Sequence, residues 1–349
     1  MTNPFARAAD PATAIDDLVT VRDWLRYAVT RFSAARLVYG HGTSNALDEA
    51  AFLILAALDL PVDQLDPWLE ARLVREERMR LLDLVERRIS TRRPAPYLVG
   101  AAWIGPHRFL VDERVIVPRS YIGELLLRDG LRSVVADPDA VGRVLDLCTG
   151  SGCLAILAAH EFPYATVDAA DISADALAVA ARNVVAHAME ERVTPVRSDL
   201  FTALAGRRYD LILSNPPYVT TAAVERFPPE YRAEPVIAHL GGADGLDIVR
   251  RILDQAAAHL TEGGMLVVEI GQGREVLEGA YPDLPFLWLD TEESEGEVFA
   301  LAAADVQAPR GGSPPAGGKV RRSPVRDQRA RSRRAGGDPV PGAPQRQGE

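Results

Sequence analysis

The chain has 349 residues, 47% of them hydrophobic, and a formal net charge of −10, which is enough apolar content for the cores of two globular domains. Residues 1–10 lack the apolar stretch of a secretory signal, and no run approaches about eighteen uninterrupted apolar residues, so we expect a cytoplasmic protein without a membrane span. Two cysteines, Cys148 and Cys153, fit neither a disulfide framework nor a zinc site, and we expect no metal.

Residues 15–89 carry apolar side chains at every third or fourth position, as at Leu18, Val21 and Leu25. This spacing puts them on one face of each helix and predicts a small helical bundle, which we assign to residues 1–102. A glycine-flanked loop, Tyr39-Gly40-His41-Gly42-Thr43, interrupts the bundle. We expect His41 to make a local hydrogen bond there rather than act as a ligand or acid-base group.

Prolines 94 and 96 end the helices, and residues 103–118 then alternate with β-branched side chains, which predicts a hairpin linking two domains. Ser120 follows this segment directly. We expect it to cap the next helix, with Glu124 in the first turns of that helix.

From Arg143 onward, apolar strand-like runs alternate with helix-like segments, which predicts an α/β fold with a doubly wound, mainly parallel sheet over residues 119–304. The last two strands are joined by an acidic loop too short for a crossover helix, so they should pair antiparallel. The result is a seven-strand Rossmann-like sheet with one reversed strand. The expected strands lie near 143–148, 165–171, 193–198, 209–214, 264–270, 285–289 and 297–302, and the clearest helices near 152–161, 173–187 and 245–260.

After Ala303 we expect order to end, and we assign residues 305–349 to a disordered tail. Residues 308–349 contain eight glycines, seven prolines and no aromatic residue, leucine or isoleucine. Ten basic and three acidic side chains give this segment a net charge of +7, against −17 for residues 1–307. The acidic part would suit a basic protein substrate, and contact with nucleic acid is expected at most through the tail.

Residues 144–156 combine a strand, a tight glycine turn and the start of a helix. Gly150 and Gly152 let a ligand approach the backbone closely, while Asp146 and the following amides present charge and donors. Asp171 ends the next strand, 21 residues beyond Gly150, where a carboxylate usually accepts hydrogen bonds from ribose hydroxyls. A nicotinamide cofactor uses similar architecture, but this loop lacks the Gly-x-Gly-x-x-Gly spacing.

The sequence Ser214-Asn215-Pro216-Pro217-Tyr218-Val219 follows the apolar run 209–213. Proline cannot continue a sheet ladder, so Asn215 should lie at the carboxyl edge of the sheet, where ligands bind in open α/β folds. The Asn215 side-chain oxygen and the Pro216 carbonyl form a pair of acceptors suited to an NH2 group, and Tyr218 offers an aromatic face. A purely structural Pro-Pro turn is the alternative.

These motifs, together with Ser198-Asp199-Leu200-Phe201, resemble those of S-adenosylmethionine-dependent amino-group methyltransferases. Over residues 15–303 the chain resembles the glutamine N5-methyltransferases, which modify Gly-Gly-Gln of translation proteins. One branch of that family acts on peptide chain release factors and the other on the third protein of the large ribosomal subunit. Pro118-Arg119-Ser120-Tyr121-Ile122-Gly123-Glu124 is similar to the ribosomal branch, with Tyr121 in place of proline, and so are residues 39–43, 146–153 and 231–235. Cys148 replaces the glycine of the wider methyltransferase loop.

The resemblance implies a class I methyltransferase fold with S-adenosyl-L-methionine as cofactor. Its methionine end would lie against residues 148–152, its ribose on Asp171 and its adenine near Asp199 and Leu200. The helical domain would recognise the substrate protein. The implied cofactor-binding residues are Asp146, Cys148, Thr149, Gly150, Ser151, Gly152, Asp171, Ile172, Asp199, Leu200 and Asn215. The implied glutamine-binding residues are Asn215, Pro216, Pro217 and Tyr218, with Asn215, Pro216 and Tyr218 catalytic.

Three alternatives remain at this point. The same reaction on release factors differs only in the protein substrate. Methylation of a nucleic-acid base would place a flipped base on Tyr218 but calls for a basic cleft. A non-catalytic cofactor-binding or ribosome-assembly module would tolerate the loss of Asn215.

Overall fold

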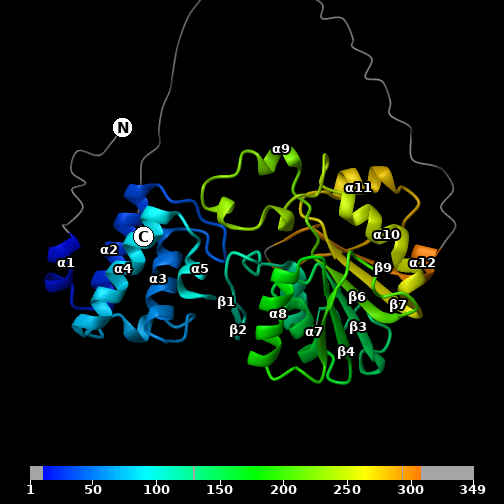
Figure 1. Ribbon diagram of the computed structural model, residues 1–349, viewed down its shortest axis with the longest axis horizontal. Helices are drawn as coiled ribbons and strands as arrows, with labels where there is room; N and C mark the ends of the chain where they lie inside the picture. Colours follow the sequence, from blue (N-terminus) through cyan, green and yellow to red (C-terminus); the bar gives the residue numbers. More distant parts are fainter. Residues whose placement is uncertain (1–10, 129, 293, 308–349) are drawn as a thin grey trace, which may run out of the picture. The chain divides into compact units, whose positions relative to one another are not determined.

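The computed structural model describes residues 11–128, 130–292 and 294–307 (Figure 1). The basic segment 308–349, expected to be disordered, lies outside these residues. No helix within the described ranges is long and apolar enough to cross a membrane.

The N-terminal helices enclose their own apolar core, which confirms the predicted helical bundle. Trp24, Phe32 and Leu53 are fully or almost fully buried in this core. Thr20 and Asp23 form a capping box that fixes the start of the second helix. The elements are α1 (Pro11–Asp17), α2 (Val21–Ala35), α3 (Ala46–Ala57), the 3₁₀ turn η1 (Asp66–Trp68), α4 (Arg75–Thr91) and α5 (Ala95–Val99).

A two-stranded antiparallel hairpin follows, formed by β1 (Ala101–Ile104) and β2 (His107–Leu110). It begins earlier and ends earlier than the predicted 103–118. Residues 111–118 do not extend the hairpin; Val111, Val115 and Val117 pack with Tyr97 in a small apolar cluster instead.

The rest of the described chain forms the predicted seven-strand α/β sheet, in the order β5-β4-β3-β6-β7-β9-β8. The neighbouring strands from β5 to β7 pair in parallel, and β9 runs antiparallel to both β7 and β8, so the single reversed strand is confirmed. The strands are β3 (Arg143–Leu147), β4 (Thr166–Asp171), β5 (Val193–Arg197), β6 (Tyr209–Ser214), β7 (Leu260–Glu269), β8 (Leu287–Leu289) and β9 (Val298–Ala302).

Helices cover both faces of this sheet (Figure 1). Side chains alternate along the strands, so Val144 faces the apolar cluster that contains α6 and α7, while Leu145 faces the cluster that contains α10 and α12. The longer helices are α6 (Tyr121–Leu127), α7 (Cys153–Glu161), α8 (Ala174–Ala186), α10 (Asp247–His259), α11 (Arg274–Ala280) and α12 (Ala303–Gln307). The short ones are η2 (Pro138–Ala140), α9 (Thr221–Val224), η3 (Tyr231–Ala233) and η4 (Val236–Ala238).

Two boundaries near the end of the described chain differ from expectation. β7 begins at Leu260, four residues before its predicted start at 264, with a register shift against β6 between Tyr209 and Leu211. Ordered structure also continues beyond Ala303, because α12 places Val306 in the core, where 4% of its surface is exposed.

Candidate functional site

A cavity of about 380 Å³ lies at the carboxyl ends of β3 to β6, a size within the range of roughly 300–1,000 Å³ that small-molecule sites occupy. Loops that follow four neighbouring strands supply its walls, as expected for an open α/β sheet. Of the predicted site residues, the cavity is lined by Cys148, Gly150, Asp171, Ile172, Asp199, Leu200, Asn215, Pro216, Pro217 and Tyr218. Asp146, Thr149, Ser151 and Gly152 are absent from its lining.

The turn after β3 uses three left-handed residues, Cys148 (φ +59°), Gly150 (φ +54°) and Gly152 (φ +81°). A Cβ at Gly150 would have no heavy atom within 4 Å, so this glycine leaves space open beside the backbone. A Cβ at Gly152 would lie 3.1 Å from Ala180 Cβ on α8. Gly152 therefore permits close helix packing, while Gly150 opens the turn to a ligand.

Asp146 organises the turn from inside the protein. It is fully buried, and its Oδ2 accepts hydrogen bonds from Thr149 Oγ1 at 2.5 Å and Ala155 N at 3.1 Å. Burial raises the pKa of Asp146 to about 7, despite these hydrogen bonds. Asp146 does not line the cavity, and its Oδ1 has no hydrogen-bond partner among the described residues, so its role toward a ligand stays a prediction.

Asp171 joins the ends of β3 and β4. Its Oδ1 accepts from Ser173 N at 2.8 Å and its Oδ2 from Gly150 N at 3.0 Å, and burial raises the pKa of this carboxyl. Each carboxylate oxygen has a second lone pair, so the side chain can still accept from ligand hydroxyls. Asp171 lies at the cavity wall, and its role in binding a ribose stays a prediction.

Asp199 also lines the cavity and forms an ion pair with Arg251 of α10, with Oδ1 at 2.8 Å and Oδ2 at 2.9 Å from Nη2. Arg251 also lines the cavity. Nothing in the sequence pointed to Arg251, since it occupies an exposed position of an amphipathic helix 52 residues further along the chain.

The Asn215 side chain has a defined orientation. Its Nδ2 donates to the carbonyl oxygen of Arg119 at 3.4 Å, and no described residue donates to its Oδ1. The donor end of the amide is therefore engaged, and the acceptor end remains for a guest in the cavity.

Glu269, at the end of β7, binds the hydroxyl of Tyr218. The Tyr218 hydroxyl donates to Glu269 Oε1 at 3.3 Å, and Glu269 Oε2 accepts from Ser120 Oγ at 2.7 Å and Tyr121 N at 2.9 Å. Burial raises the pKa of Glu269 to about 7 and also raises that of Tyr218. Ser120 occupies the N-cap position of α6, but its side chain makes no capping hydrogen bond, which corrects the predicted role.

Glycines fix the backbone of the Asn-Pro-Pro-Tyr segment. A Cβ on Gly241 would lie 2.7 Å from Tyr218 Cα, and one on Gly271 would lie 2.8 Å from the Tyr218 ring. Val219 N donates to His239 O, and Gly241 N donates to Val219 O, each at 2.8 Å. These close approaches leave the segment little freedom to move.

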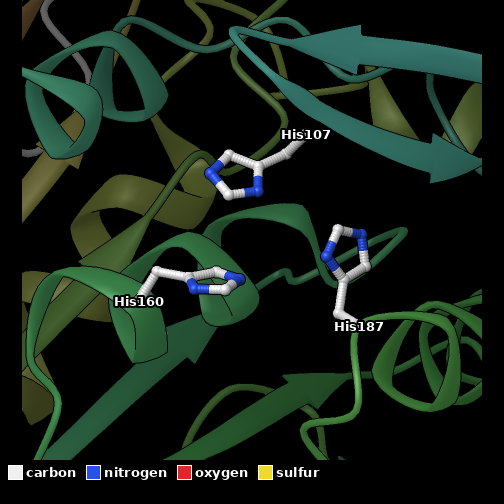
Figure 2. A group of neighbouring side chains, drawn as sticks. All are labelled: His107, His160 and His187. Atoms are coloured by element: carbon white, nitrogen blue, oxygen red, sulfur yellow. The ribbon is translucent and has the colours of Figure 1, made fainter.

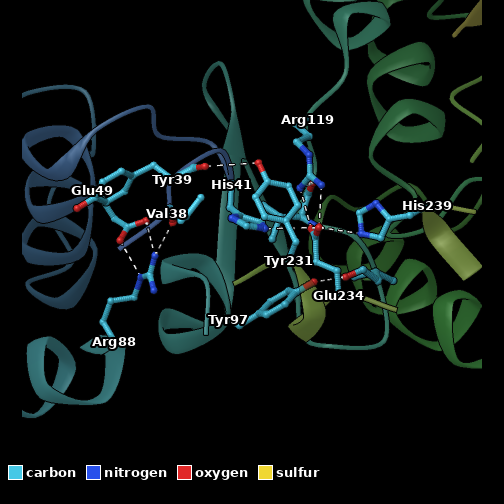
Figure 3. Close-up of polar contacts among 12 residues, drawn as sticks. Val38, Tyr39, His41, Glu49, Arg88, Tyr97, Arg119, Tyr231, Glu234 and His239 are labelled. Atoms are coloured by element: carbon cyan, nitrogen blue, oxygen red, sulfur yellow. Dashed lines mark hydrogen bonds and ion pairs between the residues drawn. The ribbon is translucent and has the colours of Figure 1, made fainter. Parts of the chain in front are cut away.

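A buried ionic network centred on Glu234 borders the cavity (Figure 3). Arg119 forms a two-pronged ion pair with Glu234, with both N···O distances at 2.7 Å, and Val117 N donates to Oε1 at 2.8 Å. His239 Nε2 lies 3.1 Å from Glu234 Oε2. Burial opposes ionisation, but the Arg119 hydrogen bonds and the neighbouring histidines hold the pKa of Glu234 well below its usual range.

His41 belongs to this network, so the expected local hydrogen bond is wrong. The side chain is completely buried, its ring centroid is 4.3 Å from that of Tyr231, and its Nε2 is 3.5 Å from Glu234 Oε2. Burial lowers the pKa of His41 despite the nearby carboxylate. A loop of the helical bundle thus reaches the wall of the α/β part.

A second contact between the same parts involves Glu230, whose Oε1 accepts from Val38 N at 3.1 Å and from Arg92 Nη1 at 3.0 Å. Gly40 (φ +127°) lies so close to Tyr231 that a Cβ would overlap the Tyr231 hydroxyl. The loop 39–43 and the segment 230–234 therefore form one interface, which we call the loop interface.

Comparison with known proteins shows what this architecture is similar to. A family model described as a methyltransferase small domain matches residues 126–227. A ribosomal protein uL3 glutamine methyltransferase from Bradyrhizobium diazoefficiens is 57% identical over 83% of this chain and 92% of that protein. The protein of the same name from Bordetella pertussis is 55% identical over 82% of this chain and 95% of its own length. Among solved structures, a ribosomal protein L11 methylase from Lactobacillus delbrueckii subsp. bulgaricus has 22% identity and a TM-score of 0.35, covering 51% of this chain and 76% of that one.

Proposed function

This chain belongs to the family of ribosomal protein uL3 glutamine methyltransferases, and on that basis we propose that it methylates the side-chain amide nitrogen of a glutamine in ribosomal protein uL3. We further propose S-adenosyl-L-methionine as the methyl donor and the cytoplasm as the location. The relatives align over more than four fifths of this chain. The site geometry supports the chemical step.

The observation that carries the proposal is the orientation of Asn215. Because Arg119 O engages the amide nitrogen, Asn215 Oδ1 is left as an acceptor, and both Asn215 and Pro216 line the cavity. Two acceptors can bind both N–H bonds of a glutamine amide and thereby aim its nitrogen lone pair. They also stabilise the positive charge that develops on nitrogen. We assign glutamine binding to Asn215, Pro216, Pro217 and Tyr218, with Asn215, Pro216 and Tyr218 catalytic.

An amide nitrogen is a weak nucleophile, because its lone pair is delocalised into the carbonyl. Correct positioning of two reactants is worth about 7–11 kcal/mol in favourable cases, so alignment is the main contribution we assign to the protein. The locked backbone around Tyr218 serves that alignment.

The cavity fits the proposed donor in size and in chemistry. S-adenosylmethionine supplies an activated methyl group on a sulfonium. Gly150 leaves room against the backbone, Asp171 offers carboxylate oxygens, and Asp199 and Leu200 also line the cavity. We assign donor binding to the cavity residues Cys148, Gly150, Asp171, Ile172, Asp199, Leu200 and Asn215. Asp146, Thr149, Ser151 and Gly152 would act indirectly, by shaping the turn.

We propose that the helical part, residues 1–102, and the linking hairpin recognise the substrate protein. The loop interface supports this assignment, because it fixes the helical part against the loops that border the cavity. Release factors remain the alternative protein substrate.

The test is a labelling experiment with the full chain. Purified enzyme and methyl-labelled S-adenosylmethionine are incubated separately with uL3, a peptide chain release factor and nucleic acid. We expect label in uL3, mapped by mass spectrometry to one glutamine, and no label after that glutamine is replaced by asparagine. Preferential labelling of the release factor or of nucleic acid would refute the proposed substrate.

A further inference from the structure

Three of the six histidines of the chain meet at one place (Figure 2). His107 comes from β2, His160 from the last turn of α7, and His187 from the C-cap of α8. One ring nitrogen from each lies within 4.8 Å of the others. None of the three lines the cavity described above, so this cluster is separate from the proposed methyl-transfer site.

The orientation of His187 suits metal coordination. Its Nε2 lies 3.0 Å from Arg108 O, and because a carbonyl can only accept, Nε2 must carry the hydrogen. Nδ1 therefore keeps its lone pair. Most metal-binding histidines are held in the same way, with the second ring nitrogen donating to a carbonyl or carboxylate. Stacking on Phe109, with ring centroids 4.9 Å apart, further fixes the His187 ring.

The helix ends favour a cation at this place. His160 and His187 stand at the C-termini of α7 and α8, where the aligned peptide dipoles present partial negative charge. Both helices are longer than two turns. The rings approach each other closely, with His107 and His160 centroids 4.7 Å apart. A tetrahedral zinc site, with Zn–N bonds of about 2.0–2.1 Å, would place the nitrogens about 3.4 Å apart, so small side-chain rotations suffice.

We propose that His107, His160 and His187 form a binding site for one divalent transition-metal ion of the zinc, cobalt or nickel type. Three neutral imidazole nitrogens are ligands for such ions and not for magnesium or calcium, which prefer oxygen. His160 is exposed, which gives an ion access and leaves a fourth coordination position for water. This departs from the sequence-based expectation of no metal. The three histidines are 53 and 27 positions apart in the chain, so the sequence alone did not indicate that they meet.

The site has a structural consequence. Coordination would clamp the hairpin onto the ends of two helices. The hairpin leads directly into Arg114, Val115 and Ile116, which line the cavity, so a bound ion would stiffen one wall of that cavity.

The experiment uses the full chain without a polyhistidine tag, after removal of metal by chelation. Equilibrium dialysis against Zn²⁺ with elemental analysis gives stoichiometry, competition with a chromophoric chelator gives affinity, and Co²⁺ absorption reports the ligand geometry. We expect one ion per chain and visible Co²⁺ bands typical of a four-coordinate nitrogen site. We also expect Zn²⁺ to raise the melting temperature, because an ion that binds only the folded chain stabilises it.

His160→Ala removes the exposed ligand with little effect on packing and should weaken binding at least tenfold, abolishing both the Co²⁺ bands and the thermal shift. His259→Gln, a substitution of a histidine outside the cluster, is the matched control and should bind like the wild type. Less than one ion per chain at saturating Zn²⁺, or equal affinity in the wild type and His160→Ala, would overturn the proposal and leave a cluster of packed rings only.

Discussion

One weak hydrogen bond orients the side-chain amide of Asn215. Its contact with Arg119 O, at 3.4 Å, is too long to contribute much to stability, and it directs the nitrogen of the amide toward Arg119. The sequence predicted the acceptor pair from the prolines that follow the strand. It did not indicate that Arg119 would contact Asn215, because Arg119 is 96 residues away and uses its backbone.

Replacing Asn215 with alanine should reduce kcat by roughly 10²–10³-fold, because one of the two acceptors for the glutamine amide is lost. Affinity for S-adenosylmethionine, measured by calorimetry, should change little. Asn215→Asp keeps an acceptor but sets a carboxylate against Arg119 O, so it should recover only part of the activity. Unimpaired turnover in the alanine variant would contradict the catalytic role assigned to Asn215.

Glu269 is a residue that sequence reasoning missed. A signal was present, since this acid ends an apolar strand at the ligand-binding edge of the sheet. Its burial raises its pKa from 4.5 to about 7. The folded state therefore binds the proton more tightly than the unfolded state. The resulting stability is fully present below about pH 4.5 and is lost as the pH rises through about 7.

Glu269→Gln keeps the shape of the side chain and removes this titration. Relative to the wild type, the variant should gain stability on going from pH 5 to pH 8.5, by on the order of 2–3 kcal/mol. Urea unfolding at both pH values measures the difference. Glu278→Gln makes the same chemical change at an exposed position, so it is the control and should show no such trend. An equal stability difference at both pH values would show that Glu269 is already ionised at pH 5.

At the level of elements, the loop interface joins two sequence motifs that are far apart in the chain. Residues 39–43 and 231–235 each resemble the ribosomal branch of the family, and the structure shows that they contact one another. This contact favours glycine at position 40, because the Tyr231 hydroxyl occupies the space of a Cβ.

Gly40→Ala should destabilise the protein by about 2–4 kcal/mol, through a disfavoured positive φ and overlap with Tyr231. Gly42→Ala is the matched control, since Gly42 also has positive φ but no heavy atom near its Cβ position. Gly42→Ala should lose only the stability that corresponds to placing alanine at a positive φ. Adding Tyr231→Phe to Gly40→Ala should restore part of the loss, as measured by a double-mutant cycle in urea. Equal losses for the two alanine variants would rule out the overlap.

Elements were predictable where local pattern and tertiary packing agree. The parallel strands and their helices follow from apolar runs punctuated by glycine and proline, and the reversed β9 follows from a short loop. The hairpin boundaries were wrong, because residues 111–118 have the alternation of a strand but pack against Tyr97 without a ladder partner. The histidine cluster could not be predicted at all, since its members belong to three elements with no shared local pattern.

At the scale of the whole molecule, the apolar clusters of the described residues lie in the acidic part of the chain, and the basic segment follows it. Residues 1–307 carry a net charge of −17 and residues 308–349 carry +7. The apolar clusters of the described residues lie between Ala14 and Val306. We therefore predict that the core formed by the described residues folds without the basic segment.

Deleting residues 308–349 should leave the melting temperature within about 2 °C of the full-length value, because a 1 kcal/mol loss in a domain of this size corresponds to roughly 2–4 °C. Methylation of uL3 in vitro should persist. Calorimetry and the labelling assay measure both. A large drop in melting temperature would show that the basic segment is structural.

Arg119 touches the proposed chemistry and the loop interface at once, through its carbonyl to Asn215 and its guanidinium to Glu234. Because Arg119 makes both contacts, the helical part and the α/β part cannot be exchanged independently of one another. In a chimera that joins a foreign helical region to this α/β part, the ionic contacts of the loop interface would not match. The Asn215 amide would then change its orientation. Compatible swaps must transplant residues 39–43, 119 and 230–234 as one unit.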